Sequence, residues 1–241
     1  MAGRRACVIA CVALMATVIH AQSTGGGGEA MRVLFIGNSL TAANNLPAVV
    51  AQLAEADGQP RPTVRMVAVD GFSLEDHWNR GDAQRAIASG GWNFVVLQQG
   101  PSALLESRRL LVEYARRFGE VTRKAGARPA LYMVWPSRER RQDAGGVSQS
   151  YRAAAAAVKG LIFPAGDAWN LVLQRRRELA LYSDDGLHPT MAGAYLAALV
   201  IYQGLYDRSP IGLPAGGLPA ADARTLQDAA MEVREPPVRV P

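Results

Sequence analysis

The chain has 241 residues, of which 49% are hydrophobic and 20% charged, and its formal net charge is +5. This apolar content is normal for a globular protein. The basic residues are mostly dispersed and lack the interleaved aromatic side chains of a single-strand binder, so we expect no nucleic-acid partner.

The first 21 residues have the layout of an export signal. Arg4 and Arg5 precede an apolar run at residues 6–19, and Ala21 offers a small residue for cleavage. This order predicts a signal peptide over residues 1–21, since the run is too short to span a bilayer. Its removal takes away two arginines and no acidic residue, which lowers the net charge from +5 to +3. We expect a secreted or periplasmic protein of about 220 residues, with no stable membrane insertion after cleavage.

Both cysteines, Cys7 and Cys11, lie inside this predicted signal, so the mature protein would have neither a disulfide nor thiol chemistry. Residues 8–11 look like a lipoprotein cleavage box, but few apolar residues precede them. Lipid anchoring and free export both stay open. Four consecutive glycines at 25–28 predict a flexible linker over residues 22–30.

From residue 32 onward, short apolar runs alternate with longer amphipathic ones, the pattern of a parallel sheet covered by helices. In chain order the expected elements are a strand at 32–36, a helix at 46–56, a strand at 64–69, a helix at 73–89 capped by Ser73, a strand at 94–97, a helix at 104–124, a strand at 130–134, a helix at 148–159, a strand at 161–164, and helices at 167–181 and 190–206. We expect one α/β domain at 31–208. A Pro/Ala/Gly-rich C-terminal extension, 209–241, would hold one peripheral helix at 220–233.

Ligands of open parallel sheets bind beyond the carboxyl ends of the strands. Polar or glycine-rich segments follow the first three expected strands, and Asp185 and His188 precede the last helix of the domain. The segments after the strands are 37–40 (GNSL), Gly71 and 98–100 (QQG). We expect all four groups to meet at one edge of the sheet.

Ser39 is either the N-cap of the following helix or a nucleophile presented by the turn at Gly37. A nucleophilic serine needs a neighbouring base. His20 lies in the predicted signal, which leaves His77 and His188. His188 follows Asp185 by three residues, so the carboxylate can bond one ring nitrogen and leave the other to face a serine. His77 lies in an amphipathic helix beside Trp78, which favours a partly buried structural histidine.

An oxyanion formed at Ser39 would need hydrogen-bond donors already aimed at it. The backbone amides of Ser39 and Gly71 are candidates, and the side-chain amide of Gln99 or Gln98 is a third. Neighbouring strand residues point to opposite faces, so only one glutamine should reach the site, and we favour Gln99. The alternative is that both glutamines cap the end of the sheet.

Taken together, the order Gly-Asn-Ser-Leu, Gly71, Gln99-Gly100 and Asp-Gly-Leu-His-Pro resembles the four sequence blocks of SGNH (GDSL-like) hydrolases, from Val33 to His188. The resemblance implies a three-layer α/β/α sandwich of the flavodoxin-like type, with a central parallel sheet of about five strands. It also implies ester hydrolysis through an acyl-enzyme, with Ser39 as nucleophile, His188 as base and Asp185 as its orienter. Gly71 would be an oxyanion donor.

Two positions depart from the family pattern. Asn38 stands where aspartate is more usual. The third block also lacks the usual Gly-x-Asn-Asp pattern, because Gly100 is followed by Pro101, Ser102 and Ala103. Gln99-Gly100 is more similar to the Gln-Gly-Glu variant of carbohydrate acetylesterases in the same superfamily. This similarity favours acylated sugars as substrates.

We therefore expect an exported serine esterase acting on a small-molecule or polysaccharide ester, with O-acetyl groups of a carbohydrate as one candidate. The alternatives are a lipid-type esterase or thioesterase with the same triad, and a catalytically silent carbohydrate-binding protein. We expect no cofactor and no metal, because at most two histidines and no cysteine remain, although Asp184 adjoins Asp185. The oligomeric state stays open.

The loop after the fourth expected strand carries three arginines, Arg138, Arg140 and Arg141, against one acid, Glu139. It is either a solvated surface loop or a cationic patch that attracts an anionic polymer to the site.

Overall fold

The computed structural model describes residues 29–235 and contains a five-stranded parallel sheet in the order β2-β1-β3-β4-β5. The predicted signal peptide and most of the predicted linker lie outside the described residues. The strands are β1 (Arg32–Gly37), β2 (Thr63–Ala68), β3 (Phe94–Leu97), β4 (Arg128–Tyr132) and β5 (Leu161–Phe163). All five expected strands are present, within two residues of their expected bounds.

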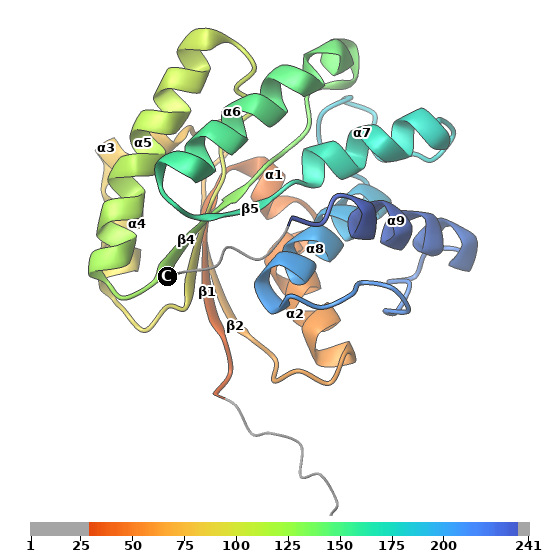
Figure 1. Ribbon diagram of the computed structural model, residues 1–241, viewed down its shortest axis with the longest axis horizontal. Coiled ribbons are helices and arrows are strands. Elements are labelled where there is room, and N and C mark those ends of the chain that lie inside the picture. Colours follow the sequence, from red (N-terminus) through yellow and green to blue (C-terminus); the bar gives the residue numbers. More distant parts are fainter. Residues whose placement is uncertain (1–28, 236–241) are drawn as a thin grey trace, which may run out of the picture.

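Helices cover both faces of this sheet (Figure 1). The helices are α1 (Ser39–Ala42), α2 (Leu46–Ala56), α3 (Leu74–Arg80), α4 (Asp82–Ala88), α5 (Leu105–Lys124), α6 (Ala144–Ala157), α7 (Ala165–Arg175), α8 (Met191–Tyr206) and α9 (Ala220–Glu232), with 3₁₀ turns η1 (Ala43–Asn45) and η2 (Arg138–Asp143). Helices α3 to α6 lie on one side, and α2, α8 and α9 lie on the other. The predicted three-layer α/β/α sandwich is confirmed.

Burial of the sheet on both faces explains its sequence. Residues 33–36 of β1 are fully buried, and residues 94–97 of β3 are almost fully buried. Strands covered on both sides read as continuous apolar runs instead of alternating ones. Polar side chains are consequently displaced to the ends of the strands, where the site lies.

Two expected helices are shorter than predicted. The helix expected at 73–89 is divided at Gly81, whose φ of +84° ends α3. Glycine adopts this left-handed conformation easily, and the apolar periodicity continues across it, which conceals the break. The helix expected at 167–181 ends at Arg175, since Leu179 and Leu181 are buried from a non-helical chain and the Leu181 carbonyl accepts the Thr190 amide at 2.9 Å.

The helix expected at 148–159 begins earlier, at Ala144, because the polar loop before it contains η2 and leads directly into the helix. Helix α9 packs against α7 and α8. Its Leu226 and Ala230 are fully buried, and the side chain of Gln203 donates to the Ala230 carbonyl at 3.3 Å. The described part of the C-terminal segment therefore contributes to the core.

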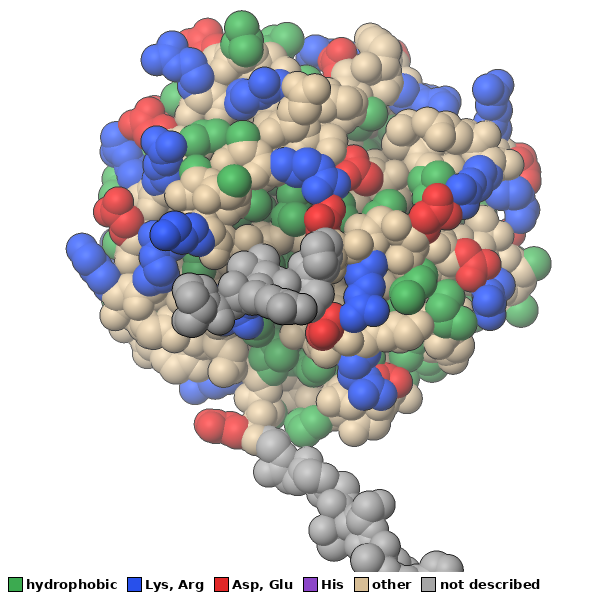
Figure 2. Space-filling view, in the orientation of Figure 1, with side chains coloured by type: hydrophobic (Ala, Val, Ile, Leu, Met, Phe, Trp, Pro, Cys, Tyr) green, Lys and Arg blue, Asp and Glu red, His purple; other side chains and the backbone are tan. Residues whose placement is uncertain are grey.

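Charged side chains of both signs are interspersed on the face seen in Figure 2. Several form exposed pairs, such as Arg175 with Glu232 at 2.7 Å. Exposed pairs of this kind contribute about 0–1 kcal/mol each, so stability rests mainly on the apolar layers.

Gly193 allows the start of α8 to pack directly on Trp169. A Cβ at this position would lie 2.6 Å from the Trp169 ring and 2.5 Å from the Leu181 carbonyl oxygen. Trp169 in turn stacks on Trp135, with ring centroids 3.6 Å apart. This close contact fixes the aromatic layer beneath the loop that carries His188.

We predict that Gly193→Ala lowers the free energy of unfolding by about 1–3 kcal/mol, because the new methyl group overpacks this contact. Gly145→Ala is the matched control. Gly145 is exposed in α6 with open space around it, and alanine should raise stability by about 0.5–1 kcal/mol. Urea unfolding measures both variants, and equal midpoints for the two would contradict the packing argument.

Candidate active site

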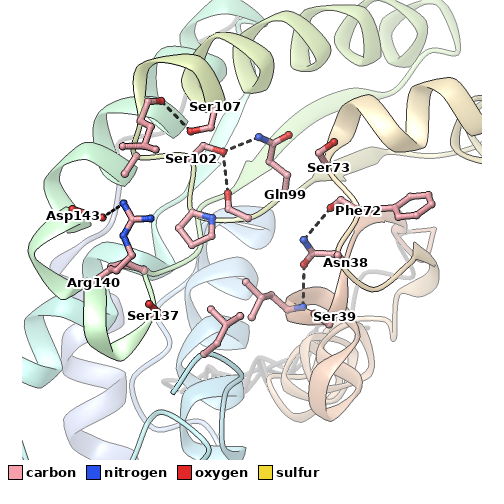
Figure 3. A pocket seen from close by; sticks show the side chains of 18 residues that line it. Asn38, Ser39, Phe72, Ser73, Gln99, Ser102, Ser107, Ser137, Arg140 and Asp143 are labelled. Atoms are coloured by element: carbon pink, nitrogen blue, oxygen red, sulfur yellow. Dashed lines mark hydrogen bonds and ion pairs between the residues drawn. The ribbon is translucent and has the colours of Figure 1, made fainter. Parts of the chain in front are cut away.

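A cleft of about 610 Å³ opens beyond the carboxyl ends of the first four strands (Figure 3). Ser39 from the β1–α1 turn, Gly71 from the β2–α3 loop and Gln99 from the end of β3 line it together. The β4–α6 loop adds Arg140, and the loop before α8 adds Leu187. Ser39, Gly71 and Gln99 therefore border one cavity, whereas Asp185 and His188 lie on either side in sequence of its lining residue Leu187 and are not themselves among the lining residues.

The turn that presents Ser39 depends on Gly37. A Cβ on Gly37 would lie 2.3 Å from the Gln98 side-chain oxygen and 2.4 Å from the Thr41 hydroxyl oxygen. No larger residue fits without displacing these buried groups. The next residue, Asn38, is the N-cap of α1 and accepts the Leu40 amide at 3.1 Å, so Ser39 is the first residue of the helix.

Asn38 also joins the serine turn to the next loop. It is 6% exposed, and its Nδ2 donates to the Phe72 carbonyl at 3.0 Å. Its Oδ1 accepts a bond from Gln98 Nε2 at 3.0 Å. An ionised aspartate could make the second of these bonds but not the first, because it has no N–H to donate. The departure from the family's usual aspartate therefore matches the surroundings of this residue.

The two glutamines at the end of β3 point to different partners. Gln98 is fully buried and makes four hydrogen bonds: it accepts from the Asn38 amide (2.9 Å) and Thr41 Oγ1 (2.7 Å), and donates to Asn38 Oδ1 (3.0 Å) and the Gln99 carbonyl (2.7 Å). Gln99 lines the cleft, where its Nε2 donates to Ser102 Oγ at 2.7 Å and its Oε1 accepts the Leu74 amide at 3.1 Å. Only Gln99 is thus placed at the cavity.

Gly71 occupies the third position of a turn closed by the Phe72 amide and the Val69 carbonyl at 3.1 Å. Its φ of +74° is one that glycine adopts without strain, and such a turn requires it. Within residues 29–235, no backbone carbonyl accepts a hydrogen bond from the amide of Gly71 or of Ser39. Both amides border the cleft as unengaged backbone donors.

Asp185 and His188 are in direct contact. Asp185 Oδ2 lies 2.5 Å from His188 Nδ1, and Oδ1 accepts the amides of Leu187 and His188, both at 2.9 Å. The Leu187 amide, the His188 ring and the His188 amide, in that order, lower the pKa of Asp185 to about 2. The carboxylate is therefore charged at any pH near neutrality, on the loop whose Leu187 lines the cleft.

His77 lies apart from this pair. It is 1% exposed in α3, and its Nε2 contacts the Gly37 carbonyl at 2.7 Å. Burial lowers its pKa, which favours the neutral ring that donates to this carbonyl. The sequence suggests a partly buried histidine, and the structure gives a fully buried one that holds the end of β1. Its helical position alone does not reveal that contact.

The arginines after β4 have different surroundings. The guanidinium of Arg138 donates to the Ser183 carbonyl at 3.0 Å, whereas Arg140 lines the cleft and pairs with Asp143 at 2.5 Å. Of the two, Arg140 is therefore paired with an acid, whereas Arg138 is bonded to a neutral backbone carbonyl.

Within the described part of the chain, no group of three or more His, Cys, Asp or Glu side chains is arranged to hold a metal ion. In the same residues, no helix combines the length and apolar character needed to cross a bilayer.

No protein-family model and no curated protein matches this chain. Among solved structures, a protein from Slackia heliotrinireducens described as an SGNH hydrolase is 31% identical, with a TM-score of 0.63, over 73% of this chain and 99% of that one. The chain belongs to the SGNH hydrolases, and it is an enzyme of the ester-hydrolysing class.

More distant structures share the fold. A DUF4886 family protein from Bacteroides uniformis is 19% identical, with a TM-score of 0.68, over 85% of this chain and 94% of that one. A mutant of the acetylxylan esterase Axe2 from Geobacillus stearothermophilus is 17% identical, with a TM-score of 0.58, over 73% and 94%.

We predict that Asn38→Asp, although it restores the family's usual residue, lowers the free energy of unfolding by about 1–3 kcal/mol. The cause is that a carboxylate oxygen would replace the donor facing the Phe72 carbonyl. Asn93→Asp is the control, since exposed Asn93 uses only its oxygen, to accept the Arg32 amide at 2.7 Å. Denaturant unfolding at neutral pH compares them, and an Asn38→Asp variant as stable as the control would refute this account of the turn.

Proposed function

We propose that this SGNH hydrolase cleaves carboxylic esters through a triad of Ser39, His188 and Asp185. The observation that carries the proposal is the bonded Asp185–His188 pair, on the loop whose Leu187 borders the same cleft as Ser39. The bond through Nδ1 leaves Nε2 as the ring nitrogen that can receive the proton of the serine hydroxyl.

The chemistry then follows in two halves. Ser39 Oγ attacks the ester carbonyl carbon while His188 takes its proton, and the tetrahedral intermediate collapses to an acyl-enzyme as the protonated His188 gives that proton to the departing alcohol. A water molecule, deprotonated by His188, attacks the acyl carbonyl carbon, and the second tetrahedral intermediate collapses to the free acid as His188 returns the proton to Ser39 Oγ. Asp185, fixed by its three hydrogen bonds, keeps the ring in one tautomer and stabilises the imidazolium form.

The oxyanion donors we propose are the amides of Ser39 and Gly71 together with the side chain of Gln99. A glutamine amide has two N–H donors. Gln98 uses both, on Asn38 and on the Gln99 carbonyl, whereas within residues 29–235 Gln99 uses one, on Ser102, and has the other available for substrate. This difference supports Gln99 over Gln98.

The cleft favours an acylated carbohydrate as substrate. Four serines besides Ser39 and the Arg140–Asp143 pair line it, and these groups are suited to sugar hydroxyls. The acetylxylan esterase among the structures of the same fold is in keeping with this class. The family relationship also favours catalysis over a silent carbohydrate-binding role. We further propose export, on the strength of the sequence at residues 1–21.

A lipid-type esterase or thioesterase is the second candidate. One observation favours it: Leu104, which lines the cleft, is 62% exposed, and the adjacent Leu105 is 75% exposed. Such side chains could contact a longer acyl chain. Acyl-chain preference distinguishes the two candidates.

We predict that Ser39→Ala abolishes hydrolysis and that Asp185→Asn lowers kcat by about 10²–10⁴, because the histidine loses its orienting carboxylate. Asp184→Asn, at the exposed neighbouring acid, should leave kcat unchanged. Rates are measured on aryl esters from acetyl to octanoyl and on acetylated xylo-oligosaccharides.

Full activity of the Ser39→Ala variant would end the triad proposal. Preference for octanoyl over acetyl esters, with no release of acetate from the saccharide, would transfer the assignment to the lipid-type alternative.

A further inference from the structure

We propose that Arg138 is a positioning residue that holds the loop of Asp185 and His188 in its active geometry. This inference rests on the proposed function. The guanidinium of Arg138 donates to the Ser183 carbonyl at 3.0 Å, and its backbone amide donates to the Gly186 carbonyl at 2.7 Å. One residue therefore binds the loop on both sides of Asp185.

Two more hydrogen bonds join the same segments. Trp135 Nε1 donates to the Leu187 carbonyl at 3.0 Å, and the Tyr182 hydroxyl donates to the Pro136 carbonyl at 2.8 Å. We call these contacts of residues 135–138 with residues 182–187 the clasp. It joins the β4–α6 loop to the loop before α8, about 45 residues further along the chain.

The loop needs such support because its two functional side chains are not packed in the core. The side chain of Asp185 is 49% exposed and that of His188 is 35% exposed. Their placement thus depends on the backbone beneath them. Ser183 transmits the constraint, since its amide and its hydroxyl both donate to the His188 carbonyl, at 2.8 and 2.9 Å.

A substrate-binding role for Arg138 is less consistent with its surroundings. Ser137 and Arg140 line the cleft, whereas the Arg138 guanidinium is directed to protein carbonyls and lies over the Tyr182 ring, 5.6 Å from its centroid. Hydrogen bonds from a charged donor are stronger than neutral ones, so the loop loses a substantial constraint without it.

The test compares Arg138→Met with Arg141→Met, an exposed arginine of the same loop. Methionine keeps a flexible stem over Tyr182 and the backbone amide of residue 138, and removes only the guanidinium donors. We expect Arg138→Met to lower kcat by about 10- to 100-fold with KM unchanged. Arg138→Lys should recover part of the loss, because an ammonium can reach one carbonyl. Arg141→Met should match the wild type.

A double-mutant cycle shows whether Arg138 affects catalysis by orienting the Asp185–His188 pair. In the Asp185→Asn background, Arg138→Met should cost little further activity, since the orientation it protects is already lost. Full additivity of the two losses would overturn the proposal. So would a loss that appears in KM and shrinks as salt is added, which would make Arg138 a substrate-binding group.

Amide hydrogen exchange gives a readout that needs no turnover. Amide exchange in the segment 183–188 should be faster in Arg138→Met than in Arg141→Met. Equal exchange rates would contradict the proposal that Arg138 holds this loop. If the wild type hydrolyses no ester, the proposed function is rejected. The exchange measurement would still show whether Arg138 holds the loop.

Discussion

The geometry of this site depends on one buried amide, that of Gln98 at the end of β3. Each of its hydrogen-bonding groups has a partner, and three of its four bonds go to Asn38 or Thr41 in the turn around Ser39. An amide buried in an apolar interior is costly unless it is bonded, so the turn and the strand hold each other in one arrangement. Through Asn38 the same network reaches Phe72 and thereby the Gly71 loop.

The proposed base is supported in a different way. The serine turn follows directly from a strand of the sheet. Asp185 and His188 instead lie on an exposed loop, which is held by hydrogen bonds within its own backbone and by the clasp. The protein therefore combines a proposed nucleophile held by the core with a proposed base held by a neighbouring loop. Loops have more freedom to move than strands, so we expect His188 to be the less firmly held member of the proposed triad.

The sequence predicts the sheet well, because its buried strands are short continuous apolar runs bounded by glycine and polar residues. It predicts helix ends less well: the break at Gly81 and the end of α7 at Arg175 depend on backbone conformation and on burial from a non-helical chain. The residues proposed for the triad stand out because their types and spacing are local features. Two other bonds join residues that are distant in the sequence. Asn38 bonds to Phe72, 34 residues away, and Arg138 bonds to Ser183, 45 residues away. No local sequence pattern indicates either pairing.

Covalent labelling shows whether Ser39 is the nucleophile that we propose. The protein is treated with a fluorophosphonate, which reacts with activated serines, and the modified peptide is identified by mass spectrometry. We expect a single adduct on Ser39, absent in the His188→Ala variant, although four other serines line the cleft. An adduct on Ser73, Ser102, Ser107 or Ser137 in place of Ser39 would contradict it.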